Sequence, residues 1–280
     1  MAVIDFFFAW NKVIIIIIDF HTHCFPDKIS ARAVAALAER ANTPPRLDGT
    51  VGDIRRSMKR VGVDASVVLS IATKPEQTEN INNWSAQIQG NGIVAFGSIH
   101  PLYENWENEL KRLRVLGLKG LKFHPDYQQF FVDDQNMYPI YEEIARLGLI
   151  MVFHCGVDIG LPSPYHCEPE RLIKVIREFP KAKIVAAHMG GYACWDDVEK
   201  YLVGENVYLD TAYSLEKMDT NQLLRMVKNH DYRKILFATD SPWCDQEEEI
   251  DKLKRLYLDS DKYNAIIGNN AENLLSKDYI

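Results

Sequence analysis

Short apolar runs alternate with amphipathic stretches along the chain, and this alternation predicts repeated β/α units. Many of the runs are apolar at nearly every position, as strands buried on both faces should be. The pattern therefore predicts a parallel sheet covered by helices. The eight predicted strands are 13–20, 65–71, 93–99, 118–123, 149–153, 183–187, 206–210 and 234–239.

Apolar residues between these runs recur at helical spacing, for example over 104–116, 138–147, 169–179 and 215–229. The first interval is longer and holds two predicted helices, near 31–41 and over 52–61. Eight such units close most economically as a (β/α)₈ TIM barrel. A doubly wound open sheet is the alternative, but it would normally carry a glycine-rich phosphate turn after its first strand. We expect one TIM-barrel domain over 13–280, preceded by an N-terminal extension over 1–12.

Composition and charge narrow the possible partners and the cellular compartment. The chain is 47% hydrophobic and carries a net charge of −7 without any basic run, which argues against binding nucleic acid. Its five cysteines contain no CxxC pair, so we expect neither disulfides nor a thiolate metal site, and we expect a cytoplasmic location. The apolar start carries Asp5 and Lys12, which argues against a signal peptide or membrane anchor. Outer helices could support a homodimer.

Polar residues end most of the predicted strands. In a β/α barrel the side chains that do chemistry project from the carboxyl ends of strands, so these residues should gather at one mouth. A single histidine there is more often a hydrogen-bonded core residue than a ligand. A metal explains the whole set together, and imidazole plus carboxylate suits zinc or a similar ion. The residues concerned are His21, His23, His100, His124, His154, His188 and Asp240.

Five ordered segments carry a family resemblance that spans residue 14 to about residue 275. The chain resembles the amidohydrolase superfamily, in its amidohydrolase-related branch of metal-dependent TIM barrels. The segments are Ile18-Asp19-Phe20-His21-Thr22-His23, Lys122-Phe123-His124-Pro125, Phe153-His154, Ala187-His188-Met189-Gly190-Gly191 and Ala238-Thr239-Asp240-Ser241-Pro242-Trp243.

The resemblance implies a ligand set and catalytic roles. It implies that His21, His23, His154 and Asp240 hold one divalent metal, most simply Zn²⁺, with a water at an open position. His188 is then a general base or, in a two-metal form, a ligand of the second ion. Asp240 could also accept a proton from that water.

Several residues have two possible roles. Lys122 is either a carboxylated bridge between two metals or an ammonium inside the barrel. His100 and His124 either contact the substrate or the ligands, or simply start loops, and Trp243 either lines the pocket or packs. Further candidates for substrate contact are Lys74, Tyr127, Gln128 and Tyr165, while His166 and His230 receive no role.

Hydrolysis of a small ester, lactone or amide by a metal-activated water is the leading prediction for function. Decarboxylation of an unsaturated or aromatic acid is the alternative within the same branch, and a noncatalytic binding barrel is the alternative of another class. The complete ligand set argues against the noncatalytic barrel. A decarboxylase needs a cation near the metal to bind the substrate carboxylate, and Lys122 or Lys74 could supply it.

Overall fold

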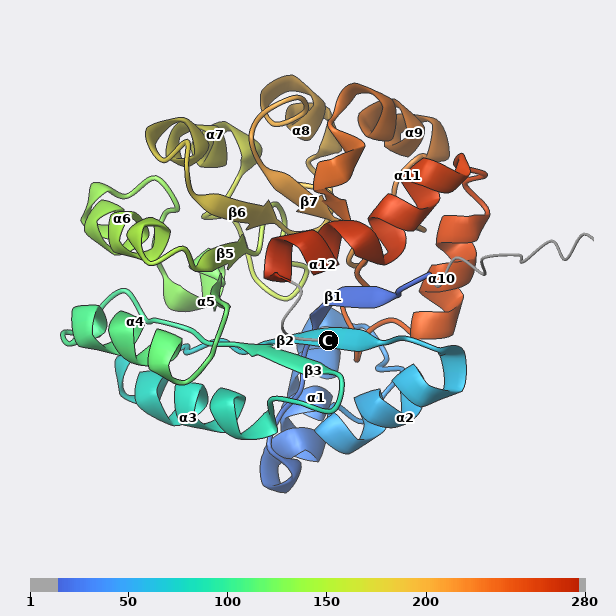
Figure 1. Cartoon of the computed structure of the whole chain (residues 1–280). Coiled ribbons are helices and arrows are strands. Elements are labelled where there is room, and N and C mark those ends of the chain that lie inside the picture. Colours follow the sequence, from blue (N-terminus) through green and yellow to red (C-terminus); the bar gives the residue numbers. More distant parts are fainter. Residues whose placement is uncertain (1–14, 277–280) are drawn as a thin grey trace, which may run out of the picture.

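The computed structural model describes residues 15–276, in which parallel strands alternate with helices around a barrel (Figure 1). This confirms the predicted (β/α)₈ fold, while the expected extension over 1–12 lies outside the described residues. The described strands are β1 Ile18–Thr22, β2 Ala65–Leu69, β3 Ile93–Phe96, β4 Gly120–Phe123, β5 Ile150–Phe153, β6 Lys183–Ala186, β7 Tyr208–Asp210 and β8 Ile235–Leu236.

Two runs of paired strands, β1-β2-β3 and β4 to β8, meet at two seams that close the barrel. At the seam between β3 and β4, the Gly97 amide donates to the Gly120 carbonyl and the Lys122 amide donates to the Gly97 carbonyl, both at 2.9 Å. A Cβ on Gly120 would lie 2.5 Å from both the Phe96 ring and a β5 carbonyl, so this approach needs glycine. At the other seam, the Phe20 amide donates to the Phe237 carbonyl at 2.9 Å.

Helices cover the barrel, and polar side chains fix where several of them begin. The Thr50 hydroxyl accepts the Asp53 amide at the start of α2, which ends at Gly62 in the left-handed region. The first crossover contains both predicted helices, α1 and α2. The described α-helices are α1 Asp27–Ala41, α2 Val51–Val61, α3 Thr78–Ile88, α4 Trp106–Val115, α5 Pro125–Gln128, α6 Tyr138–Arg146, α7 Pro169–Glu178, α8 Trp195–Tyr201, α9 Thr220–Asn229, α10 Gln246–Lys254, α11 Ser260–Asn264 and α12 Asn270–Leu275.

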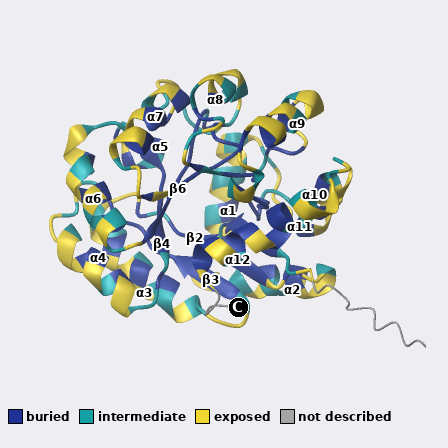
Figure 2. Ribbon diagram, turned by 45° about the horizontal axis from the view of Figure 1, so that its top comes forward, coloured by how far each residue is buried: buried dark blue, intermediate teal, exposed yellow. Residues whose placement is uncertain are grey.

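The hydrophobic core has two layers because side chains alternate across each strand. On β2, Ala65, Val67 and Leu69 belong to the cluster inside the barrel, and Val68 belongs to the cluster between the strands and the helices. Figure 2 shows the buried strands surrounded by helices with exposed outer faces. This layering leaves the carboxyl ends of the strands as the place where polar side chains can enter the barrel.

An irregularity in β1 changes which side chains face the barrel interior. Ile18 and Phe20 both belong to the inner cluster, and the Phe20 ring meets Phe96 edge to face. Regular alternation would then point His21 outward, yet the register of β1 against β2 shifts between Asp19 and Thr22. The shift lets apolar residues fill the barrel while the following histidines face its mouth.

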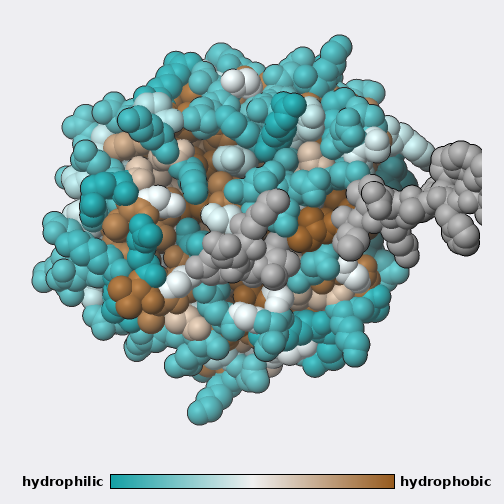
Figure 3. Space-filling view, viewed as in Figure 1, coloured by the Kyte–Doolittle hydropathy of each residue, from teal (hydrophilic) through white to brown (hydrophobic). Residues whose placement is uncertain are grey.

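The face drawn in Figure 3 is largely hydrophilic, with hydrophobic residues in separated patches. Among residues 15–276, no helix combines the length and the apolar character needed to cross a bilayer.

Candidate metal centre

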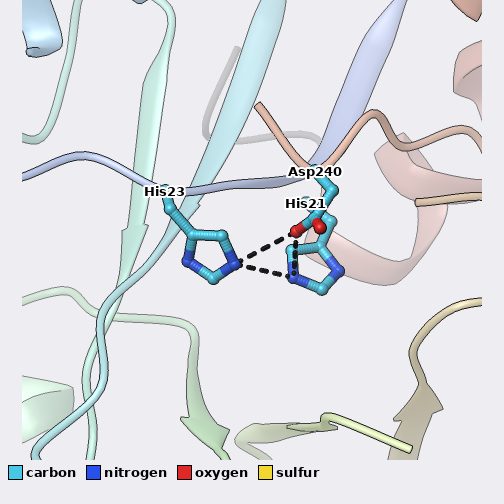
Figure 4. A group of neighbouring side chains, drawn as sticks. All are labelled: His21, His23 and Asp240. Carbon is cyan, nitrogen blue, oxygen red and sulfur yellow. Dashed lines mark hydrogen bonds and ion pairs between the residues drawn. The ribbon is translucent and has the colours of Figure 1, made fainter. Parts of the chain in front are cut away.

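His21, His23 and Asp240 point toward one another at the carboxyl ends of β1 and β8 (Figure 4). Their nearest donor atoms form a triangle. The Nε2 atoms of His21 and His23 are 3.2 Å apart, and the Asp240 Oδ1 atom lies 3.4 Å from the first and 3.2 Å from the second. Two ligand atoms on a tetrahedral Zn²⁺ are about 3.3 Å apart, so the triangle fits one face of such a site.

The other ring nitrogen of each histidine assigns the tautomer. His21 Nδ1 lies 2.9 Å from Asp210 Oδ2, and His23 Nδ1 lies 2.9 Å from the Leu69 carbonyl. Because both partners are acceptors, the protons belong on Nδ1, and both Nε2 atoms present lone pairs. Three acceptor atoms then face one another, and a shared cation is what makes this arrangement favourable.

Two buried carboxyl groups set the electrostatics of this group. Burial acts to raise the pKa of Asp240, but a proton on His23 Nε2, or a positive charge on His21 or His188, favours the carboxylate, and the pKa of Asp240 lies below its usual value. Burial raises the pKa of Asp210, against the lowering effect of His188 and Lys122. Burial also holds the pKa of His21 well below its usual value, which favours the neutral ring that a metal needs.

Lys122 brings a cationic side chain to the same place from β4. The side chain is fully buried, and its Nζ lies 3.2 Å from His21 Nε2. Burial lowers the pKa of Lys122, while the charges of Asp210 and Asp240 act in the opposite direction. Lys122 and His124 both line the cavity.

His154 and His188 form a second pair of facing rings beside the triangle. His188 Nδ1 lies 2.9 Å from the Ala212 carbonyl, which assigns its proton there, so Nε2 accepts from His154 Nδ1 at 3.0 Å. His154 Nε2 therefore carries a lone pair, and it is buried without a hydrogen-bond partner. An unpartnered buried acceptor is costly, and its presence at the mouth fits the predicted role of His154 as a ligand.

His124, His154 and Asp158 form another cluster of possible ligand atoms, but its geometry argues against a shared ion. The rings of His124 and His154 are stacked, with centroids 4.1 Å apart and planes 9° apart. Imidazole lone pairs lie in the ring plane, so two stacked rings cannot both direct one at the same metal. Both nitrogens of His124 are also engaged, since Nδ1 accepts the Tyr127 amide and Nε2 lies 3.1 Å from Asp158 Oδ2.

Backbone strain concentrates where these residues leave their strands. His188, Met189 and Asp240 have φ angles of 60°, 52° and 67°, in the left-handed region that favours glycine. Such conformations cost about 1–3 kcal/mol each and cluster at functional sites. The strained turns place His188 and Asp240 at the mouth.

A cavity of about 550 Å³ opens above these residues. Only some of the residues predicted to contact the substrate line this cavity. Tyr127 and Trp243 line it, together with His23, His124, His154, His188 and Lys122, whereas Lys74, His100 and Tyr165 do not. His100 Nδ1 instead accepts the Leu102 amide, consistent with a loop start, because the chain leaves β3 well before residue 100. Gln128 donates to the Ala72 and Ile99 carbonyls.

The two histidines without a predicted role have structural partners. His166 Nδ1 lies 2.8 Å from Asp126 Oδ1, and His230 Nε2 lies 3.0 Å from the Val207 carbonyl.

Sequence analysis missed two carboxylates of the site. Asp210 ends a predicted strand in the same way as Asp240, so its position was a usable signal. It accepts the His188 amide as well as the His21 ring. Asp158 follows β5 within a loop, and nothing in the local sequence marks it as the partner of His124.

The barrel and the donor set define a metal-dependent enzyme of the TIM-barrel type. The chain belongs to the amidohydrolase family, because the family model described as "Amidohydrolase" matches residues 18–277. This confirms the resemblance found in the sequence. No curated protein matches the chain.

Three solved structures that share this fold are each 15% identical to this chain. The 5-carboxyvanillate decarboxylase LigW from Sphingomonas paucimobilis is 15% identical, with a TM-score of 0.70 over 93% of this chain and 99% of that chain. The 2,6-dihydroxybenzoate decarboxylase from Rhizobium is 15% identical, with a TM-score of 0.71 over 94% and 99%. A dihydroxybenzoic acid decarboxylase from Polaromonas with bound manganese and 2-nitroresorcinol is 15% identical, with a TM-score of 0.68 over 93% and 96%.

Proposed function

We propose that the protein is a metal-dependent decarboxylase of an aromatic or unsaturated carboxylic acid. The observation that carries this proposal is the buried Lys122 side chain beside the metal-ligating triangle. A decarboxylase must hold a substrate carboxylate at the reacting centre, whereas a hydrolase of neutral esters or amides has no such need.

The formal charges around Lys122 leave room for one anion. A divalent cation and the Lys122 ammonium carry +3, and the neighbouring Asp210 and Asp240 carboxylates carry −2. The +1 that remains in the immediate surroundings of Lys122 can be balanced by one substrate carboxylate, while Asp158, the third carboxylate at the mouth, is paired with His124. In a buried site this balance matters, because an uncompensated charge is expensive there.

The residues at the mouth have different roles in the proposed reaction. The metal, held by His21, His23 and Asp240 with His154 as the predicted fourth ligand, would bind substrate oxygens and stabilise developing negative charge. Lys122 positions the carboxylate. The bond between the carboxyl carbon and its neighbour breaks, CO₂ leaves, and the electron pair stays on the neighbouring carbon. His188, which lies beside the predicted ligand His154, takes up a proton from solvent and delivers it to that carbon.

The structural neighbours support this choice. Three solved structures with the same fold and high coverage are named as decarboxylases of hydroxylated aromatic acids, and one of them contains manganese. We therefore propose zinc or manganese as the metal, at one ion per chain. Hydrolysis of an ester, lactone or amide, which was the leading prediction from the sequence, becomes the alternative, and the description of the family favours it.

The experiment compares two substrate panels with the metal-loaded protein. One panel contains hydroxylated benzoates and unsaturated acids with CO₂ release as the readout, and the other contains lactones, esters and amides. We expect CO₂ release that is lost on chelation and restored by zinc or manganese. Hydrolysis without any CO₂ release would overturn the proposal.

Substitution of Lys122 tests the observation on which the proposal rests. Lys122→Met should keep the metal and lose CO₂ release by about 10²-fold or more, since a charge-assisted contact to the carboxylate disappears. Lys74→Met is the matched control, because Lys74 is exposed and does not line the cavity. Equal loss in both variants, or no loss in Lys122→Met, would contradict the assignment.

A further inference from the structure

The cavity extends well beyond the metal-ligating triangle. Its inner end is formed by residues such as His23, Lys122 and Asp240, and its outer part lies between α1 and α3. The volume of about 550 Å³ is several times the roughly 150 Å³ that holds one benzene ring. A single-ring acid bound at Lys122 would leave most of the outer part unfilled.

The outer part is lined by an apolar stripe of α1. Ile29, Ala33, Leu37 and Ala41 are spaced four residues apart, so they share one face of the helix, and all four line the cavity. None of the four is buried, and Ile29 is 41% exposed. The second helix of this crossover, α2, packs against β2, which leaves α1 free to cover the mouth.

The wall on the α3 side is mostly apolar and partly exposed, with Asn80 as its polar member. Ile81 and Trp84 of α3 line the cavity, and Ile159 contributes from the loop after β5 at 45% exposure. Binding of an apolar ligand is favoured here, because the ligand removes from water the apolar side chains that face the cavity from two helices. Exposed apolar residues in one concave patch mark a binding site more often than scattered ones do.

We infer that the ligand is an amphipathic carboxylic acid whose apolar arm, several carbons long, lies between α1 and α3 while its carboxylate faces Lys122. This inference rests on the proposed function for the carboxylate end only. Leu37 and Trp84 then act as specificity residues that select acids larger than one ring.

The test measures binding and needs no turnover. Benzoate and its 4-ethyl, 4-butyl and 4-hexyl derivatives are titrated into the metal-loaded protein by calorimetry. Each buried methylene should raise affinity about three- to fourfold, because burying a CH₂ group contributes about 0.8 kcal/mol. Affinity that stays flat across the series would overturn the inference.

Variants locate the arm. Leu37→Gln should flatten the dependence on chain length, while Ala33→Phe should weaken binding of 4-hexylbenzoate at least tenfold and leave benzoate unchanged. Leu102→Gln is the matched control, since Leu102 is 75% exposed and lies outside the cavity. If affinity depends on chain length in the same way in Leu37→Gln and Ala33→Phe as in the unsubstituted protein, the arm lies elsewhere and the inference is overturned.

The two proposals fail in different ways. A steep dependence on chain length without CO₂ release from any acid would refute the decarboxylase and keep the apolar arm. Equal affinity of 4-hexylbenzamide and 4-hexylbenzoate would refute the placement of the carboxylate at Lys122. CO₂ release with a flat series would keep the decarboxylase and refute the arm.

Discussion

Two clusters of histidine and carboxylate lie at the same barrel mouth, yet their geometry gives them different capacities. In the triangle of His21, His23 and Asp240, the two imidazole rings are 73° apart and their Nε2 atoms meet at 3.2 Å. In the cluster of His124, His154 and Asp158, the two rings are stacked at 9°. The first cluster converges lone pairs on one point. In the second the rings are stacked, and His124 uses both of its nitrogens for other bonds.

The difference shows that residue type alone does not define a metal site. Both clusters contain two histidines and an aspartate, and both lie at the same mouth of the barrel. What separates His124 from the histidines of the triangle is the partner of its Nδ1 atom. Acceptors behind His21 and His23 leave Nε2 free for a cation, whereas a donor amide behind His124 directs its Nε2 proton to Asp158.

The largest expected effect is loss of metal from the triangle. His21→Ala or Asp240→Ala should leave metal occupancy near zero by elemental analysis of the purified protein, because each removes one corner of the triangle. Asp158→Ala is the matched control and should keep close to one ion per chain. Full occupancy in a variant lacking His21, His23 and His154 would refute the site, and a stoichiometry near two in the unsubstituted protein would make Lys122 and His188 ligands.

Removal of His188 should separate proton transfer from metal binding. We expect His188→Ala to keep its metal and to lose about 10²-fold or more in kcat, as when a general acid or base is lost. Metal content and turnover are measured on the same preparation. If the metal leaves with the ring, His188 belongs among the ligands.

Substitution of Asp210 tests how much the hydrogen-bond acceptor behind the ligand His21 contributes to metal affinity. Asp210→Asn keeps the shape but weakens the bond that orients His21, so metal affinity should fall about 10- to 100-fold. Competition with a chromogenic chelator gives the affinity. An unchanged affinity would show that the His21 tautomer does not depend on this carboxylate.

The smallest effect is expected in the stacked cluster. His124→Phe keeps a ring against His154 but leaves Asp158 without its partner, which should cost about 1–3 kcal/mol of unfolding free energy. Metal occupancy should stay unchanged. Urea unfolding of the metal-loaded protein measures the cost, and metal loss in this variant would remove the distinction between the two clusters.

The sequence by itself determined the barrel, because strands buried on both faces read as continuous apolar runs and their crossovers carry helical spacing. It also predicted that His21, His23 and Asp240 meet at the mouth, from the HxH spacing on one strand and an aspartate ending the last strand, whereas the fourth predicted ligand, His154, falls in the other cluster. Strand ends were less well determined. The third predicted strand ran to residue 99, but β3 ends at Phe96, where the Asn82 side chain takes over the Ser98 amide.

Only the tertiary structure decided which groups stand behind the ligands and which way β1 points them. Asp210 reaches His21 across 189 residues, and the shift in β1 turns its histidines to the mouth although Phe20 already faces inward. Likewise, the stacking of His124 on His154 depends on the spacing between β4 and β5. Local patterns encode the period of each element, but tautomers, ring angles and register shifts arise from contacts between elements far apart in the chain, so they appear only when the barrel has formed.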